Sequence, residues 1–202
     1  MRCASRRILH PPSMRRVVPL ALLLVLALPA LALATQVEAL TLRELTADAD
    51  RIVVGTVIAE EAHYDDLDRI VTDSTIRVED TLYGPSEPTI VVRHIGGVVG
   101  DLGLRVAGEE PYAMGDRMLL FLRTFDSGDV GPVFRPVGMS QGEMPIVSRT
   151  EGEMILPGAA GVSVVERAPD GRLTPAVPAL TAPVQRDELL ARVRDLVAEV
   201  HR

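Results

Sequence analysis

The feature that most constrains the fold is a series of short apolar segments, separated by turn residues, with no helical pattern between them. Parallel sheets need crossover helices, and none is visible here. Segment 70–82 places Ile76, Val78 and Leu82 on one face, which is typical of a half-buried antiparallel strand. These segments predict a mainly β protein, an antiparallel barrel or a sandwich. The six strand candidates are 52–58, 70–82, 89–95, 117–123, 133–137 and 144–148.

Two helices are expected at the ends of this β region. Thr41 is a typical N-cap residue, and Glu44 follows at the spacing of a capping box, so a short helix should begin there. An amphipathic helix is expected over 186–202, with its apolar stripe packed on the barrel. The residues of that stripe are Leu189, Leu190, Val193, Leu196, Val197 and Val200.

Composition divides the chain into four parts. Residues 1–39 are expected to be a signal peptide, 40–150 the β-barrel domain, 151–185 a Pro/Gly-rich extension and 186–202 the C-terminal helix. Within the extension, 162–165 could add an edge strand. Within the barrel domain, Gly55 predicts a bulge or bend in its strand, and residues 60–68 predict an acidic loop.

The first residues have the order of a secretory signal. Five Arg precede an uncharged apolar run over 17–34, and small-x-small cleavage sites end at Ala34 and at Ala39. We therefore expect an exported chain, in the periplasm or outside the cell. The run is near the lower limit for a membrane span, so a retained anchor in a structural envelope protein stays open, and only then would the chain contact a membrane.

Charge and composition exclude several classes of function. The chain has 21 basic and 28 acidic residues, all the basic ones being Arg. Cleavage after Ala34 leaves 16 Arg against the same 28 acids, a balance of −12. Such a surface repels phosphate backbones, so no nucleic-acid partner is expected. The single Cys, Cys3, lies in the signal, so the mature chain has no disulfide and no Cys-based zinc site.

One motif suggests an enzyme. Gly138-Met139-Ser140-Gln141-Gly142 fits G-x-S-x-G, in which a hydrolase places its Ser on a strand-to-helix turn. The following residues predict a strand instead, and only His201 follows Ser140 in the chain. We therefore expect two glycines in a turn and no catalytic residue, and keep a small serine hydrolase using Ser140 as the alternative.

The candidate binding residues lie in three places. Paired acids in one loop could hold calcium, but the EF-hand spacing fails, and no metal and no cofactor are expected. His94 is in phase with the apolar residues of its strand, which is typical of a core or rim histidine. A glycine-rich stretch over 96–105 ends in Arg105. The candidates are Tyr64, Asp65, Asp66, Asp68, His94 and Arg105.

The order of three stretches resembles a known family. ADRIVVGTV at 49–57 is followed by TIRVEDTLYG at 75–84 and, after a Gly-rich bend, by GDRMLLFL at 115–122. This order resembles a group of uncharacterised exported bacterial proteins and, more distantly, the netrin-like domain of tissue inhibitors of metalloproteinases. The resemblance covers about 41–148 and implies an OB-type barrel. With it, the fold that we expect is an antiparallel OB-like barrel between a short N-terminal helix and the C-terminal amphipathic helix. Those inhibitors bind the target's zinc through an amino-terminal cysteine, which the mature chain lacks, so no inhibitory residue is carried over.

These observations favour a non-enzymatic module. We expect an exported binding or accessory protein whose partner is another exported protein, for example a protease. OB barrels bind through one strand face and the adjoining loops, so residues 64–68 and 96–105 are the first places to examine.

Overall fold

The computed structural model describes residues 35–127 and 132–202. Residues 1–34 of the predicted signal peptide therefore lie outside the described part of the chain. The described chain is mainly β, with one short helix near its start and a longer helix near its end, as predicted. Within it, no helix is both long enough and apolar enough to cross a membrane. The helical elements are α2 (Leu42–Asp48), the 3-10 turn η2 (Met139–Gly142) and α3 (Arg186–Val200). The strands are β1 (Gln36–Glu38), β2 (Arg51–Tyr64), β3 (Ile70–Tyr83), β4 (Thr89–Ile95), β5 (Gly97–Val99), β6 (Leu102–Leu104), β7 (Arg117–Asp126), β8 (Pro132–Pro136), β9 (Glu143–Arg149), β10 (Gly152–Ile155), β11 (Ser163–Arg167), β12 (Leu173–Pro175) and β13 (Val184–Gln185).

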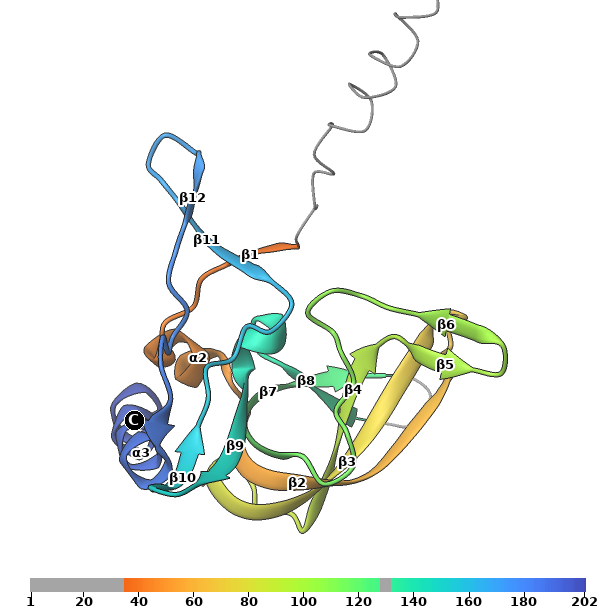
Figure 1. Ribbon diagram of the computed structural model, residues 1–202, viewed down its shortest axis with the longest axis horizontal. Helices are drawn as coiled ribbons and strands as arrows, with labels where there is room; N and C mark the ends of the chain where they lie inside the picture. Colours follow the sequence, from red (N-terminus) through yellow and green to blue (C-terminus); the bar gives the residue numbers. More distant parts are fainter. Residues whose placement is uncertain (1–34, 128–131) are drawn as a thin grey trace, which may run out of the picture. The chain divides into compact units, whose positions relative to one another are not determined.

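The largest sheet has eight strands in the order β13-β10-β9-β7-β2-β3-β4-β8 (Figure 1). Strands β2, β3 and β4 form an antiparallel meander. Strand β8 pairs in parallel with β4 through Val92 and Phe134, and it also pairs antiparallel with β7 over five residue pairs. The pairings therefore return on themselves, from β7 through β2, β3, β4 and β8 to β7.

Strands β2 and β3 are longer than the sequence predicts. Each has 14 residues, and β2 runs on to Tyr64. The predicted acidic loop over 60–68 is therefore wrong for residues 60–64, which pair with 70–74 of β3. The predicted irregularity at Gly55 is confirmed, because the register shifts between Val54 and Gly55. A Cβ on Gly55 would lie 2.7 Å from the Arg77 carbonyl oxygen, so only glycine fits there.

Two hydrophobic cores lie on the two faces of these strands. The first core is built from β2, β3, β4, β7 and β8, together with Tyr112 from the loop before β7. Alternate residues of β2 and β7 point the other way and form the second core with α2, α3 and β9. On β7, for example, Leu120 belongs to the first core and Phe121 to the second, as the two-residue period of a strand requires.

The predicted helices are confirmed. The Thr41 hydroxyl accepts from the Glu44 amide at 3.2 Å, and the Glu44 carboxylate accepts from the Thr41 amide at 2.8 Å, which completes the capping box. Helix α3 buries Leu189, Leu190 and Val193 in the second core, against the sheet and α2.

Residues 151–185 hold more regular structure than a Pro/Gly-rich extension suggests. Strand β10 pairs with β9, so the large sheet continues through the expected boundary at residue 150. The suggested strand at 162–165 is present as β11, which lies between β1 and β12 in a separate three-stranded sheet. The signal peptide was predicted to extend to residue 39, but residues 36–38 form β1 of that sheet.

Candidate functional site

The turn between β2 and β3 is organised by Asp65. One carboxylate oxygen accepts from the amides of Leu67 and Arg69, at 3.0 and 2.9 Å. The other accepts from Nε and Nη2 of Arg69, at 2.8 and 2.6 Å. The hydrogen bonds from Arg69 hold the pKa of Asp65 below its ordinary value. Asp65 is therefore a buried structural residue of the turn, whereas Asp66 and Asp68 are exposed.

A charged network lies beside this turn, across the three strands of the meander. Arg93 of β4 donates Nε and Nη2 to the two oxygens of Asp73 of β3, at 2.6 and 2.7 Å. His63 of β2 places Nε2 3.1 Å from the second oxygen. Burial alone would raise the pKa of Asp73, but the hydrogen bonds from Arg93 and His63 outweigh it and lower that pKa. Burial would lower the pKa of His63, but its bonds to the Tyr64 carbonyl and Asp73 raise it.

The turn and Arg93 of the network line a cleft of about 320 Å³, which we call the turn cleft. Phe125, near the end of β7, also lines the cleft and is 37% exposed. The cleft therefore combines carboxylates, two guanidinium groups and an accessible aromatic ring. Its lining residues are Asp65, Asp66, Leu67, Arg69, Arg93, Phe125, Asp126 and Ser127.

A second hollow of about 320 Å³ also has Phe125 in its wall. Arg135 of β8 lies over the Phe125 ring, with its guanidinium carbon 5.6 Å from the ring centre, a cation–π distance. Its Nη2 donates to Glu109 at 2.8 Å, and the other oxygen of Glu109 accepts from the Ile95 amide at 3.1 Å. Glu109 thus fixes both Arg135 and the loop after β6 relative to β4.

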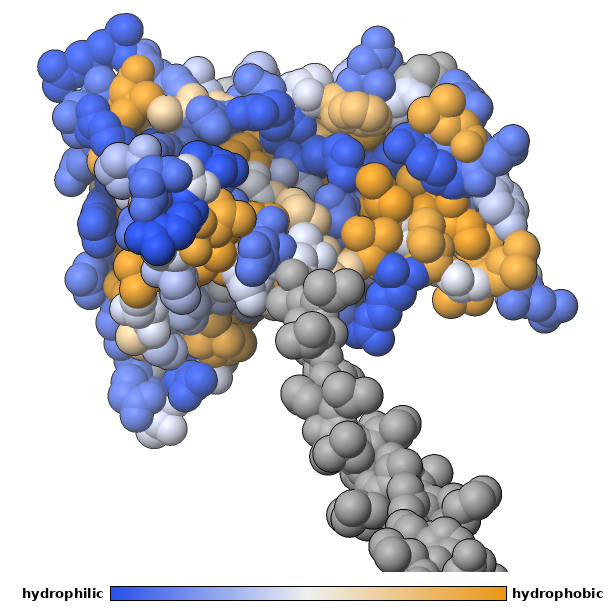
Figure 2. All heavy atoms as spheres, turned by 90° about the horizontal axis from the view of Figure 1, so that it is seen from above, coloured by the Kyte–Doolittle hydropathy of each residue, from blue (hydrophilic) through white to orange (hydrophobic). Residues whose placement is uncertain are grey.

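The hairpin of β5 and β6 exposes apolar side chains. Val98, Leu102 and Leu104 are 69%, 63% and 39% exposed, and we call these three residues the apolar hairpin. In Figure 2, hydrophobic residues gather on the side of the molecule where Figure 1 places β5 and β6. A Cβ built on Gly97 would lie 3.2 Å from the Ala62 Cβ, so β5 packs directly against the end of β2. The apolar hairpin and the β2–β3 turn therefore lie at the same end of these strands.

Two more exposed apolar residues lie at this end of the strands, one at the end of β2 and one in the turn. Tyr64 is 45% exposed and Leu67 is 69% exposed. Exposed apolar residues that gather at one end of a domain commonly mark interaction surfaces. Of the predicted candidates, Tyr64, Asp65, Asp66 and Asp68 thus belong to this end of the molecule, and Arg105 follows the hairpin in an exposed ion pair with Glu110.

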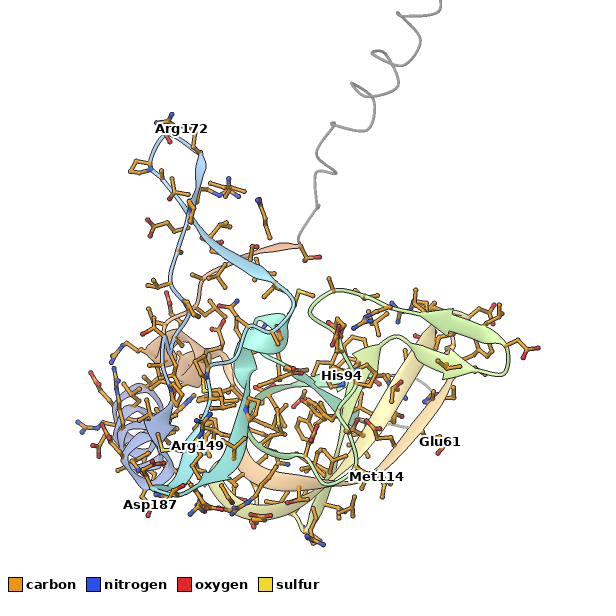
Figure 3. The ribbon with its side chains drawn as sticks, viewed as in Figure 1. Glu61, His94, Met114, Arg149, Arg172 and Asp187 are labelled. Atoms are coloured by element: carbon orange, nitrogen blue, oxygen red, sulfur yellow. The ribbon has the colours of Figure 1, made fainter. Side chains whose placement is uncertain are left out.

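His94 lies apart from this surface, in the interior (Figure 3). Its Nε2 is 2.6 Å from Glu143 Oε1 of β9, and the Tyr112 hydroxyl donates to the same oxygen at 3.0 Å. The Tyr112 ring meets the imidazole edge-on, with the ring centres 4.6 Å apart. Burial, then the adjacent Glu143 carboxylate, raises the pKa of Tyr112 well above its ordinary value. The cluster links β4, β9 and the loop before β7, which agrees with a core role for His94.

Ser140 has a structural contact in this conformation. It is 4% exposed, and its hydroxyl donates to the Ala160 carbonyl at 2.8 Å. Gly138 has a φ of +64° and starts the 3-10 turn η2, so these residues form a turn, as expected, rather than a strand-to-helix elbow. His201 contacts the Thr46 carbonyl at 2.9 Å, so Ser140 and His201 contact different backbone carbonyls.

The acidic residues do not assemble a cation site in the described part of the chain. There, no three His, Cys, Asp or Glu side chains are grouped so that they could hold a metal ion. Both Asp65 oxygens accept hydrogen bonds within the turn, which leaves that carboxylate engaged by Arg69 rather than free for calcium.

Sequence reasoning did not select Arg69, Arg93 or Phe125. Arg93 could have been found, because it is a charged residue within a strand that is otherwise largely apolar. Phe125 follows the apolar run of β7. It lines the cleft because the β2–β3 turn lies next to it in the fold, which the sequence does not show. Comparison with known proteins adds no assignment, since no family model and no curated protein matches the chain.

Proposed function

We propose that the five strands whose pairings close on themselves form an OB-like barrel. The support is the order of the strand pairings. Strands β2, β3 and β4 form an antiparallel meander, β8 lies parallel to β4, and β7 pairs antiparallel with both β8 and β2. A five-stranded Greek-key barrel has this form. In such a barrel the ligand-binding loops are those between the first two and the last two strands. Here these are the turn after β2 and the hairpin of β7 and β8.

On this barrel we propose an exported, non-enzymatic binding module for a protein partner. One observation carries the proposal: the apolar hairpin and the exposed Tyr64 and Leu67 lie at one end of the meander, next to the turn cleft. Aromatic and apolar anchors beside arginines are the composition of protein interfaces. The acidic balance of the chain argues against a nucleic-acid or anionic membrane ligand.

An exported protease is the partner class that we would test first. This choice rests on the resemblance to the netrin-like domain and on the proposed barrel, at the level of fold. It implies no zinc-binding residue in this chain. Contact would instead come from the apolar hairpin and the turn cleft, so an inhibitory or an accessory effect on the protease is equally compatible with the surface.

The test is a binding experiment with matched variants. Residues 35–202 are immobilised, exposed to the exported proteins of the source organism, and the retained proteins are identified by mass spectrometry. Leu102→Glu places a charge on the apolar hairpin, and Val177→Glu places one on a distant residue that is 73% exposed. We expect one partner to be retained by the wild type and by Val177→Glu and lost with Leu102→Glu.

Two outcomes contradict the proposal. If the wild type and both variants retain the partner, its binding site lies elsewhere on the chain. If the wild type retains no protein, the proposal of a protein partner is wrong. The serine hydrolase alternative is tested in parallel with a fluorophosphonate probe. Labelling that disappears in Ser140→Ala would replace the binding proposal, although the buried hydroxyl and its bond to Ala160 give that alternative no support.

A further inference from the structure

The six residues from Thr35 to Leu40 are built into the fold. Strand β1 pairs in parallel with β11, with Gln36 opposite Ser163 and Glu38 opposite Val165. The Ser163 amide donates to the Thr35 carbonyl at 2.9 Å, and the Ala39 amide donates to the Val165 carbonyl at 2.8 Å. Figure 1 shows β1 beside β11, which comes from the far end of the chain. These contacts cover both sides of the second cleavage motif, which ends at Ala39.

Gln141 holds the same segment from the opposite direction. Its side-chain oxygen accepts from the Leu40 amide at 2.9 Å, and its side-chain nitrogen donates to the Glu38 carbonyl at 3.0 Å. Gln141 is 2% exposed, so water has little access to its amide, and leaving a buried amide unpaired is costly. Leu40 itself packs against the core formed with α2 and α3. The side-chain amide of Gln141 therefore holds the backbone on both sides of Ala39 in place.

From this we infer a processing site: the mature protein begins at Thr35, through hydrolysis of the bond between Ala34 and Thr35. A signal peptidase splits that amide with one water molecule, which leaves a carboxylate on Ala34 and an amino group on Thr35. Ala32 and Ala34 supply the small residues that this enzyme class needs. The inference rests on the proposed export of the chain and adds the position of the cut.

Cleavage at the second motif, after Ala39, would damage the fold. It would remove β1, leave the Ser163 amide and the Val165 carbonyl without these partners, and leave Gln141 without the Glu38 carbonyl. The three-stranded sheet would be reduced to the β11–β12 hairpin, and isolated two-stranded hairpins are marginally stable. The first motif leaves all of these contacts intact.

The test uses the full chain, expressed in a bacterial host that exports it, and intact-mass analysis of the product. A product that starts at Thr35 supports the inference, and one that starts at Leu40 overturns it while leaving export intact. A product that still carries residues 1–34 overturns the cleavage. If that product is held in the membrane with its domain outside the cytoplasm, the retained anchor is correct. If it stays in the cytoplasm, export itself is contradicted, and with it the location in the proposed function. The failures of the two ideas are therefore distinguishable.

Two matched substitutions sharpen the test. Ala34→Phe places a bulky residue at the inferred cleavage position and should abolish the Thr35 product, whereas Ala39→Phe should leave it unchanged. The opposite pattern would assign the cut to the second motif. In the processed protein, Gln141→Ala should lower the melting temperature by about 5 °C or more, because its two bonds to residues 38–40 and a third, to the Gly138 carbonyl, are lost. Gln185→Ala, which removes one exposed bond to the Glu151 carbonyl, should change it little, and equal shifts would refute the role given to Gln141.

Discussion

Replacing Asp73 by Asn should destabilise the domain strongly, because Asp73 neutralises the buried Arg93. Arg93 is 4% exposed, and the Asp73 side chain is 14% exposed. The carboxylate accepts two bonds from Arg93, at 2.6 and 2.7 Å, and Asn would turn one acceptor into a donor. Removing one partner of a buried ion pair typically costs about 3–5 kcal/mol. Some water reaches Asp73, so we expect a loss of about 3 kcal/mol, or about 6–12 °C in melting temperature for a domain of this size.

The assay is urea unfolding of residues 35–202 at pH 7, followed by circular dichroism. Asp66→Asn is the matched control, because Asp66 is an exposed carboxylate close by on the β2–β3 turn. A double-mutant cycle with Arg93→Met should show coupling, since removing both charges costs less than the sum of the single changes. A loss below about 1 kcal/mol for Asp73→Asn, or one equal to the control, would refute the reasoning.

The pH dependence of the same variant gives an independent check. The pKa of Asp73 in the folded protein is lower than in the unfolded chain, since the bonds from Arg93 and His63 outweigh the effect of burial. Its contribution is therefore present above the unfolded pKa of about 4, and it is lost as the pH falls through the folded pKa. The difference in stability between the wild type and Asp73→Asn should shrink below about pH 4. A difference that stays constant down to pH 2 would contradict the assigned pKa shift.

Three further predictions concern other parts of the fold. Thr41→Ala should cost about 1 kcal/mol in urea unfolding, because the capping box is lost, and an unchanged midpoint would contradict that role. Leu190→Ala should cost about 3 kcal/mol, since Leu190 is 2% exposed in the core under α3, whereas the exposed Arg192→Ala should be nearly neutral. The pKa of His63 is raised in the folded protein, so its contribution should be complete below about pH 6.5 and lost as the pH rises through the folded pKa. The stability deficit of His63→Gln should thus be larger at pH 5.5 than at pH 8.5, and the reverse order would contradict this assignment.

The candidate site could be predicted only in part. The sequence selected the β2–β3 turn and the stretch after β4 because OB barrels bind through loops that adjoin the strands, and acids and glycines gather in these two. It did not select Phe125, whose residue type is common in strands, or Arg93, although a charge within a largely apolar strand was a usable signal. Their position beside the turn depends on how β7 and β4 are placed around β2 and β3, and no local pattern carries that information. His94 was assigned to the core or rim from its phase in the strand, but its partner Glu143 lies in β9, far away in sequence.

The sequence by itself determined the features that depend on near neighbours along the chain. The mainly β class, the capping box at Thr41, the irregularity at Gly55 and the amphipathic helix α3 all follow from periodicity or from backbone sterics over a few residues. The tertiary structure alone decided which strands pair, that 151–185 add strands to two sheets, and that Gln141 holds residues 38–40. These contacts join segments distant in sequence, so their stability depends on the whole packed arrangement and not on any local preference.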